Sequence, residues 1–319
     1  MAAFAARFDR DLIRQWMPMI TLVALALIVG TVTPQFLTVD SLLVLAADTA
    51  TLFILATGVT FVIMLGGIDL SIQSMASLSS VLIALSVSRF GYGSILLAVG
   101  AGALSGFLAG VAHVKLRIPS FIATLAVGGV LAGTALVISG ARSITLGEAE
   151  RGYLGWVSGY SLGVPHEVFI GIVVLVLAHV VQSRTRFGRY SAAIGAGEAA
   201  AYAAGVKVDR TKILALTLSG ALAAFAGVIL AGRLSSGSPT LANELLLPAI
   251  AAVVVGGTAI TGGIGSIWRT AIGALIISVV RIGMTFVGVD IFAQQIVFGV
   301  VLILAVAITI DRSKIPIVK

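Results

Sequence analysis

The sequence predicts an all-α polytopic membrane protein of about ten transmembrane helices, with both termini in the cytoplasm. Of its 319 residues, 59% are hydrophobic and only 10% are charged, whereas soluble domains carry about 25% charged residues. Many of the apolar runs reach the roughly 20 residues that cross a bilayer. Short polar connections rich in Arg and Lys separate these runs. We therefore expect a single membrane domain over 1–319 and no water-soluble enzyme core.

The first apolar run follows Arg7, Arg10 and Arg14 and is similar to a signal anchor. No Ala-X-Ala cleavage site follows this run, so we expect it to be retained. The eighth segment is short and contains Gly256 and Gly257, a pattern that is also consistent with a broken or re-entrant segment. The ten predicted segments are 17–33, 42–65, 72–88, 93–113, 119–139, 166–182, 212–232, 246–260, 267–287 and 291–310.

The basic residues predict the orientation of these segments. With the N-terminus inside, fifteen of the 20 Lys and Arg residues lie in cytoplasmic connections and only four lie in outer ones, in agreement with the positive-inside rule. The net charge of +7 therefore reflects segment ends and does not indicate nucleic-acid binding. The longest outer connection is 140–165, and its aromatic residues favour the membrane–water interface or an external partner.

The most informative connection is the cytoplasmic segment Arg184–Lys212, which carries six Lys and Arg residues. Its alanine-rich centre, Glu198–Ala204, favours a helix, and Gly205 is a typical residue to end that helix. The predicted helix lies outside the membrane and presents an alanine surface around one large side chain, Tyr202. A short helix that does not bury itself in its own chain usually binds another chain, so we expect a partner here.

The motif Gly66-Gly-Ile-Asp69-Leu-Ser71 follows the second predicted segment. The two glycines permit a tight connection with positive φ. Asp69 is then placed to cap the next helix, with Ser71 as a second polar group. Two interpretations stay open and are compatible: a structural cap at a cytoplasmic hairpin, and a gate element that moves with the cytoplasmic helix Glu198–Ala204.

Two ionisable residues, Asp48 and Arg281, lie within predicted membrane segments. A charge at the bilayer centre costs about 2.5–3.5 kcal/mol on insertion scales, so such residues usually face a cavity or a partner. Arg281 is long enough to extend its guanidinium to the outer interface, and both placements remain open for it. Asp48 is short, so we expect it to face the protein interior or a cavity.

Other patterns exclude several classes of function. Gly102, Gly106 and Gly110 are four residues apart, a spacing that indicates close packing of membrane helices. The sequence has no cysteine and no G-x-x-x-x-G-K-[ST] motif, so we expect no thiolate chemistry and no ATP-binding loop in this chain. The three histidines are scattered and no nucleophile–base pair is evident. We therefore expect no catalytic residues, no metal site and no bound cofactor.

The cytoplasmic segment resembles the coupling loop of permeases from ATP-binding-cassette importers, especially the ribose-type branch, which imports monosaccharides and related polyols. The resemblance runs in consistent order over 18–310, with one departure: many members carry an acidic pair where this chain has Leu246 and Pro248, with Glu244 upstream. The matching motifs are Arg186-Phe-Gly-Arg-Tyr190, Ala193-Ile-Gly195, Glu198-Ala-Ala200, Gly205-Val-Lys-Val208, Thr57-Gly-Val-Thr60, Gly66–Ser71, Phe121-Ile-Ala-Thr-Leu125, Arg233-Leu-Ser-Ser236, Ala249–Thr258 and Gly262-Gly-Ile-Gly265.

The resemblance implies a permease subunit in the bacterial inner (plasma) membrane that moves a monosaccharide or polyol into the cytoplasm. The implied partners are a separate ATPase subunit, which uses the ATP, a second permease copy (identical or not), a periplasmic sugar-binding protein and membrane lipid. The residues expected to couple to the ATPase are Gly188, Arg189, Gly195, Glu198, Ala199, Ala200, Tyr202 and Gly205. The candidates for the pathway or gate are Asp48, Asp69, Ser71, Phe121 and Thr124.

Two other classes compete with this interpretation. A proton-coupled secondary transporter of a small polar solute would use Asp48 or Asp69 as its intramembrane acid. A membrane-embedded enzyme would need several polar groups that converge within the spans, and the sequence offers few. Dependence of uptake on ATP or on the proton gradient separates the first two classes.

Overall fold

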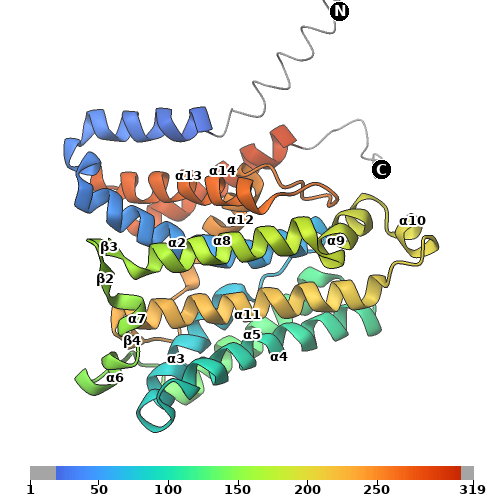
Figure 1. Ribbon diagram of the computed structural model, residues 1–319, viewed down its shortest axis with the longest axis horizontal. Coiled ribbons are helices and arrows are strands. Elements are labelled where there is room, and N and C mark those ends of the chain that lie inside the picture. Colours follow the sequence, from blue (N-terminus) through green and yellow to red (C-terminus); the bar gives the residue numbers. More distant parts are fainter. Residues whose placement is uncertain (1–18, 310–319) are drawn as a thin grey trace, which may run out of the picture.

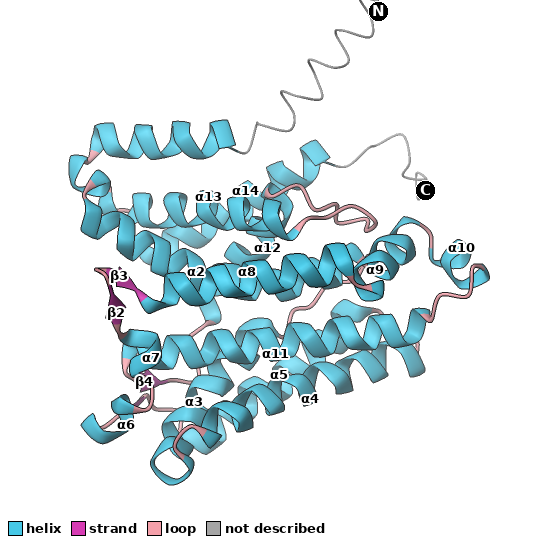
Figure 2. Cartoon of the chain, viewed as in Figure 1, coloured by secondary structure: helices cyan, strands magenta, loops and turns pink. Residues whose placement is uncertain are grey.

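The computed structural model describes residues 19–309, and this part of the chain is mostly helical (Figures 1 and 2). Six of the helices described are long and apolar enough to cross a membrane, and each coincides with a predicted segment. They are α2 (Val39–Met64), α4 (Gly93–Lys115), α5 (Ser120–Ser139), α8 (His166–Arg184), α11 (Val208–Leu234) and α13 (Ile267–Phe286).

Helices also occupy the other four predicted segments, but they are shorter or more polar. The third segment forms α3 (Ile72–Phe90), which is rich in serine. The eighth forms η2 (Asn243–Leu245) and α12 (Leu246–Val255) and ends at Gly256, where a non-helical stretch begins. The first segment gives the apolar helix Met19–Val32, with positions 17 and 18 outside the described residues. The tenth gives α14 (Ile291–Thr309).

The long helices run side by side and separate two groups of short elements (Figure 1). At one end, the strand end, β1 (Ile144–Thr145) pairs antiparallel with β4 (Ser236–Gly237), and β2 (Tyr160–Ser161) pairs with β3 (Val164–Pro165). The one-turn helices α6 (Glu148–Gly152) and α7 (Gly155–Ser158) lie there as well. At the opposite end, the coupling end, lie α9 (Arg186–Ala196) and α10 (Glu198–Ala203).

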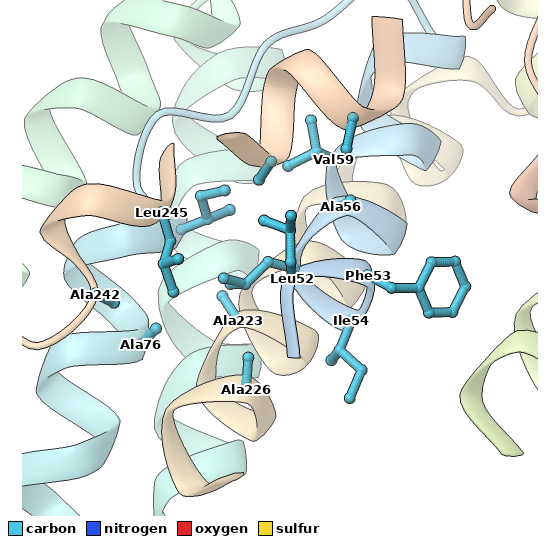
Figure 3. Close-up of a cluster of buried hydrophobic side chains, with 14 of the residues drawn as sticks. Leu52, Phe53, Ile54, Ala56, Val59, Ala76, Ala223, Ala226, Ala242 and Leu245 are labelled. Atoms are coloured by element: carbon cyan, nitrogen blue, oxygen red, sulfur yellow. The ribbon is translucent and has the colours of Figure 1, made fainter. Parts of the chain in front are cut away.

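The core is built around α2, whose second half is fully buried. Figure 3 shows Leu52 of α2 near the small residues Ala223 and Ala226 of α11, and Ala56 and Val59 of α2 belong to the same buried cluster. Small side chains let these helices approach closely without polar contacts. The long apolar sequence of α2 thus forms the centre of the bundle instead of a lipid-facing surface.

The predicted glycine packing of α4 is confirmed against α11. A Cβ atom at Gly106 would lie 2.1 Å from the carbonyl oxygen of Leu216, and one at Gly102 would lie 2.3 Å from that of Gly220. At Gly110 it would lie 2.8 Å from the Cα atom of Ile213. The two backbones therefore touch along the whole glycine stripe.

Candidate functional site

The coupling end contains two short helices where the sequence predicted one. Thr185 begins α9, and its side chain accepts a hydrogen bond from the Gly188 amide. The predicted helix is α10, which starts at Glu198 and ends at Ala203, and Gly205 follows with φ +79°. Gly205 therefore has the left-handed conformation predicted from its position.

One side of this helical pair is buried and the other is exposed. Ile194 of α9 and Ala201 of α10 pack with Val62 and Leu216 in a small hydrophobic cluster. Tyr202, in contrast, is 75% exposed. The other exposed positions here include Arg189, Ala196, Ala199, Ala200, Ala203 and Ala204. The exposed alanines and Tyr202, which we call the alanine face, leave an apolar surface open at this end.

Glu198, one of the residues expected to couple to the ATPase, has a partner within its own chain. Its Oε2 atom accepts a hydrogen bond from Lys212 Nζ at 2.7 Å. The turn after α10 brings the start of α11 back beside α10, so two residues fourteen positions apart meet. Glu198 thus fixes α10 to α11 within the chain, although its side chain remains 56% exposed.

Three glycine motifs that are far apart in the sequence meet beneath α9. A Cβ atom at Gly195 would lie 1.9 Å from the Met64 carbonyl oxygen and 2.2 Å from the Gly263 amide nitrogen. The Gly263 amide donates a hydrogen bond to the Met64 carbonyl at 2.9 Å. A Cβ at Gly262 would lie 2.9 Å from the Gly66 nitrogen. We call these contacts the glycine junction.

Gln182 at the end of α8 reinforces this region. Its amide nitrogen donates to the Gly265 carbonyl at 2.9 Å, and its amide oxygen accepts from the Ile267 nitrogen at 2.9 Å. These bonds satisfy backbone groups of the loop between α12 and α13. The helix that leads into α9 is therefore tied to that loop both by side-chain bonds and by the glycine junction.

The segment Gly66–Ser71 packs against α5, with Asp69 and Ser71 buried and Gly66 exposed. Gly66 has φ +78°, as predicted, but Gly67 does not have a positive φ. The Ile68 amide donates to the Ser120 hydroxyl at 2.9 Å, and the Leu70 amide donates to the Thr124 hydroxyl at 3.0 Å. Two hydroxyls of α5 thus replace the water that an exposed loop would use.

Asp69 organises the start of α3, although not as the predicted N-cap. The N-cap position belongs to Ser71, and Asp69 Oδ1 accepts from the Ser71 amide at 2.9 Å and from its hydroxyl at 2.6 Å. Asp69 is 1% exposed, and its Oδ2 atom has no hydrogen-bond partner among the described residues. A buried carboxylate oxygen without a partner is costly, so this arrangement is a candidate for a group whose contacts change in another state.

A cavity of about 360 Å³ separates this segment from α10. Its lining includes Gly66, Gly67 and Phe121 on one side and Glu198 with Lys212 on the other. Phe121 is 47% exposed. Three of the four gate candidates near this end, Asp69, Ser71 and Thr124, therefore lie in one hydrogen-bonded group, and Phe121 lies at the adjacent cavity.

Asp48, the fifth candidate, lies at the strand end, in a cluster that the sequence did not predict. Its Oδ1 atom accepts from Arg233 Nη1 at 3.3 Å, and its Oδ2 atom accepts from Arg281. Arg233 Nε is 3.9 Å from Glu167 Oε1. Asp48 is mostly buried, as expected. Arg281 is paired within the bundle, which resolves the two placements left open for it.

Six apolar helices long enough to cross a membrane, packed with α2 at their centre, define a multi-pass membrane protein. Comparison with protein families identifies it as a transport permease. Residues 41–306 match the family described as "Branched-chain amino acid transport system / permease component". The chain belongs to this family, and it is a multi-pass protein of the bacterial inner (plasma) membrane.

Several proteins similar to this chain are named as sugar import permeases. The chain is 37% identical to the ribose import permease protein RbsC of Escherichia coli (strain K12), over 96% of each chain. It is 40% identical to the ribose import permease protein RbsC of Bacillus subtilis (strain 168), over 93% of this chain and 92% of the relative. The fructose import permease protein FrcC of Rhizobium meliloti is 33% identical over 91% of this chain and 82% of the relative. No solved structure matches the sequence.

Proposed function

We propose that this chain is the membrane-spanning permease subunit of a bacterial ATP-binding-cassette importer that brings a monosaccharide or polyol into the cytoplasm. The ribose and fructose named for its relatives support this substrate class. We further propose ten membrane segments with both termini in the cytoplasm, because the Lys and Arg distribution favours this orientation. The coupling end then faces the cytoplasm and the strand end faces the periplasm.

The exposed alanine face carries the proposal. An ATPase subunit docks on Ala199, Ala200 and Tyr202 of α10, which present little bulk and one aromatic anchor. Arg189 of α9 is exposed on the same helical pair. The partner binds and hydrolyses the ATP, and this chain holds no cofactor. A second permease copy, a periplasmic sugar-binding protein at the strand end and membrane lipid complete the assembly.

The glycine junction supplies the route from ATP to the membrane segments. Closure of the ATPase subunits moves α9 and α10. Because Gly195 contacts Met64 and Gly263 at backbone distance, this motion passes to the end of α2 and to the loop before α13. The transition between outward-facing and inward-facing states then follows from the different contacts that the ATPase makes in each state.

The substitution Ala200→Arg tests ATPase docking. Ala200 is exposed, so the substitution leaves the permease folded but places bulk and charge in the interface. We expect weaker ATPase association in pull-down, together with lower sugar-stimulated ATP hydrolysis and uptake. Leu116→Arg is the matched control, because Leu116 is 67% exposed at the end of α4. If both variants associate with the ATPase as well as the wild-type permease does, the ATPase does not dock on the alanine face.

A charge exchange tests the role of Glu198. Glu198→Lys breaks the pair with Lys212, and the double variant Glu198→Lys with Lys212→Glu restores it in reverse. If Glu198 only fixes α10 to α11, the double variant regains ATPase association. If Glu198 also contacts the ATPase directly, association remains low in the double variant while the permease keeps its thermal stability.

The alternative is a proton-coupled secondary transporter that uses Asp48 or Asp69. Both oxygen atoms of Asp48 are engaged by arginines, which is a poor arrangement for a group that must exchange protons with water. The decisive observation is uptake in cells: retention after ATP depletion together with loss on addition of an uncoupler would favour the alternative.

A further inference from the structure

The ionic cluster at the strand end joins four helices. Asp48 comes from α2, Glu167 from α8, Arg233 from α11 and Arg281 from α13. Two carboxylates and two guanidinium groups leave the cluster without net charge. Each of the two arginine side chains remains more than a fifth exposed. The cluster is therefore within reach of water and of a small solute, unlike the apolar core around α2.

A cavity of about 400 Å³ opens beside this cluster. Asp48, Arg233 and Arg281 form one part of its wall. Elsewhere the wall holds Glu244, Gln294 and Gln295. The Gln295 amide nitrogen donates to Glu244, both to its carboxylate and to its carbonyl oxygen at 3.3 Å. The Gln294 amide nitrogen donates to the Thr285 hydroxyl at 3.1 Å. Acceptors and donors thus alternate around one space.

The apolar part of the same wall is aromatic. Phe286 and Phe298 line the cavity together with Val44 and Ile282. Phe286 is 38% exposed and stands edge-on to Phe36, with ring centroids 5.9 Å apart. A ring held in this way offers a firm apolar surface at one side of a polar cavity. The site therefore combines polar groups on one side with an aromatic surface on the other.

This combination fits a neutral polyhydroxylated ligand better than a charged one. Each hydroxyl of a sugar both donates and accepts, and the cavity supplies carboxylate acceptors with guanidinium and carboxamide donors. The C–H surface of a sugar ring matches the phenylalanine side. The charged side chains in the cavity wall are two carboxylates, Asp48 and Glu244, and two arginines, so the wall offers no excess attraction for an anion or a cation. The volume is at the small end of the roughly 300–1,000 Å³ found for small-molecule sites.

We infer that this cavity is the acceptor site through which the permease receives a monosaccharide or polyol at the strand end. The inference rests on the proposed function, which delivers the sugar to that end. The site is weak by design, because a solute that must move on has to leave it again. In the empty site Arg281 is paired with Asp48 and Gln295 with Glu244. A bound sugar replaces these contacts with its own, so the polar groups are paired whether or not the site is occupied.

The chain contains no cysteine, which gives a direct binding test. Thr285→Cys, or separately Val44→Cys, places one thiol at the cavity wall, and Leu162→Cys places one on the fully exposed β2–β3 turn. The permease, assembled with its ATPase and binding protein in lipid vesicles, is screened for uptake of D-ribose, D-fructose, D-xylose, xylitol and myo-inositol. Each compound, with sucrose as a bulk control, is then tested for protection against maleimide alkylation.

We expect the transported compound to slow alkylation of Thr285→Cys and of Val44→Cys several-fold and to leave Leu162→Cys unchanged. Compounds that are not transported, and sucrose, should protect neither cavity position. Gln295→Ala combined with either cavity cysteine should reduce the protection. Uptake of a sugar without protection at either cavity position would refute the acceptor site and leave the proposed function intact. Absence of ATP-dependent uptake for every compound would refute the proposed function and this inference together.

Discussion

The substitution Gly195→Ala, which adds a methyl group, tests most directly whether the glycine junction transmits motion from the ATPase to the membrane helices. In Gly195→Ala the added Cβ would lie 1.9 Å from the Met64 carbonyl oxygen and 2.2 Å from the Gly263 nitrogen. Both are backbone atoms and cannot rotate away, so α9 and the end of α2 must move apart by about 1 Å. Overpacking of this kind costs about 1–3 kcal/mol. The higher helix propensity of Ala offsets up to about 1 kcal/mol of that cost.

The expected result is a folded but less stable permease in which coupling is lost disproportionately. Gly100→Ala is the control: Gly100 is in the middle of α4, and a Cβ there would meet no described atom within 4 Å. The assays are the midpoint of thermal unfolding of the purified permease and sugar-stimulated ATP hydrolysis of the assembled importer. Gly195→Ala should lower both values, and Gly100→Ala neither. If the two variants behave alike in both assays, the glycine junction does not transmit motion from the ATPase to the membrane segments.

Three further outcomes follow from the same structure. Gly106→Ala should destabilise the permease by about 1–3 kcal/mol relative to Gly100→Ala in the same helix, measured by thermal unfolding, because its Cβ would lie 2.1 Å from a carbonyl of α11. Impermeant maleimide added to intact cells should label a cysteine at Tyr153 and not one at Tyr202; the reverse pattern would invert the proposed topology. Asp48→Asn should lower the unfolding midpoint, since it leaves two arginines beside each other, yet keep uptake dependent on ATP; proton flux that accompanies sugar in the wild type and disappears in this variant would promote the secondary-transporter alternative.

The sequence predicted those parts of the fold that depend on hydrophobic segment length and on helix propensity. Apolar length located the six long spans, and alanine content with a following glycine located α10, which ends two residues before Gly205. The helix α9 was missed because Gly188 and Gly195 weaken helix propensity in an otherwise polar stretch. Packing overrides that propensity: Ile194 is buried, and the absence of side chains at the glycines is what permits backbone contact.

The polar contacts of the site were less accessible from sequence, because each of them joins distant segments. Asp48 was expected to face inward, but its partners Arg233 and Arg281 are 185 and 233 positions away. Glu198 carried a plausible role at a partner surface, and only the fold shows that Lys212 returns beside it. A carboxylate in a membrane segment predicts that a partner exists, whereas the identity of that partner depends on how the helices are assembled.

The helix α2, like α8 and α11, runs from the strand end to the coupling end of the molecule. Asp48 lies near its strand end, and Met64, which contacts Gly195, lies 16 residues further along the same helix, about 24 Å away at 1.5 Å per residue. Between them α2 has no break, and its side chains are buried almost without interruption. A buried, continuous helix moves as a unit more readily than it bends, because bending would disturb close-packed contacts along its whole length. If α9 moves as we propose, a displacement of Met64 reaches Asp48 and is accommodated by Arg233 and Arg281, which come from other helices. The charged groups that can exchange partners then lie at the strand end, while the buried polar side chains of α2 between Asp48 and Met64 are threonines.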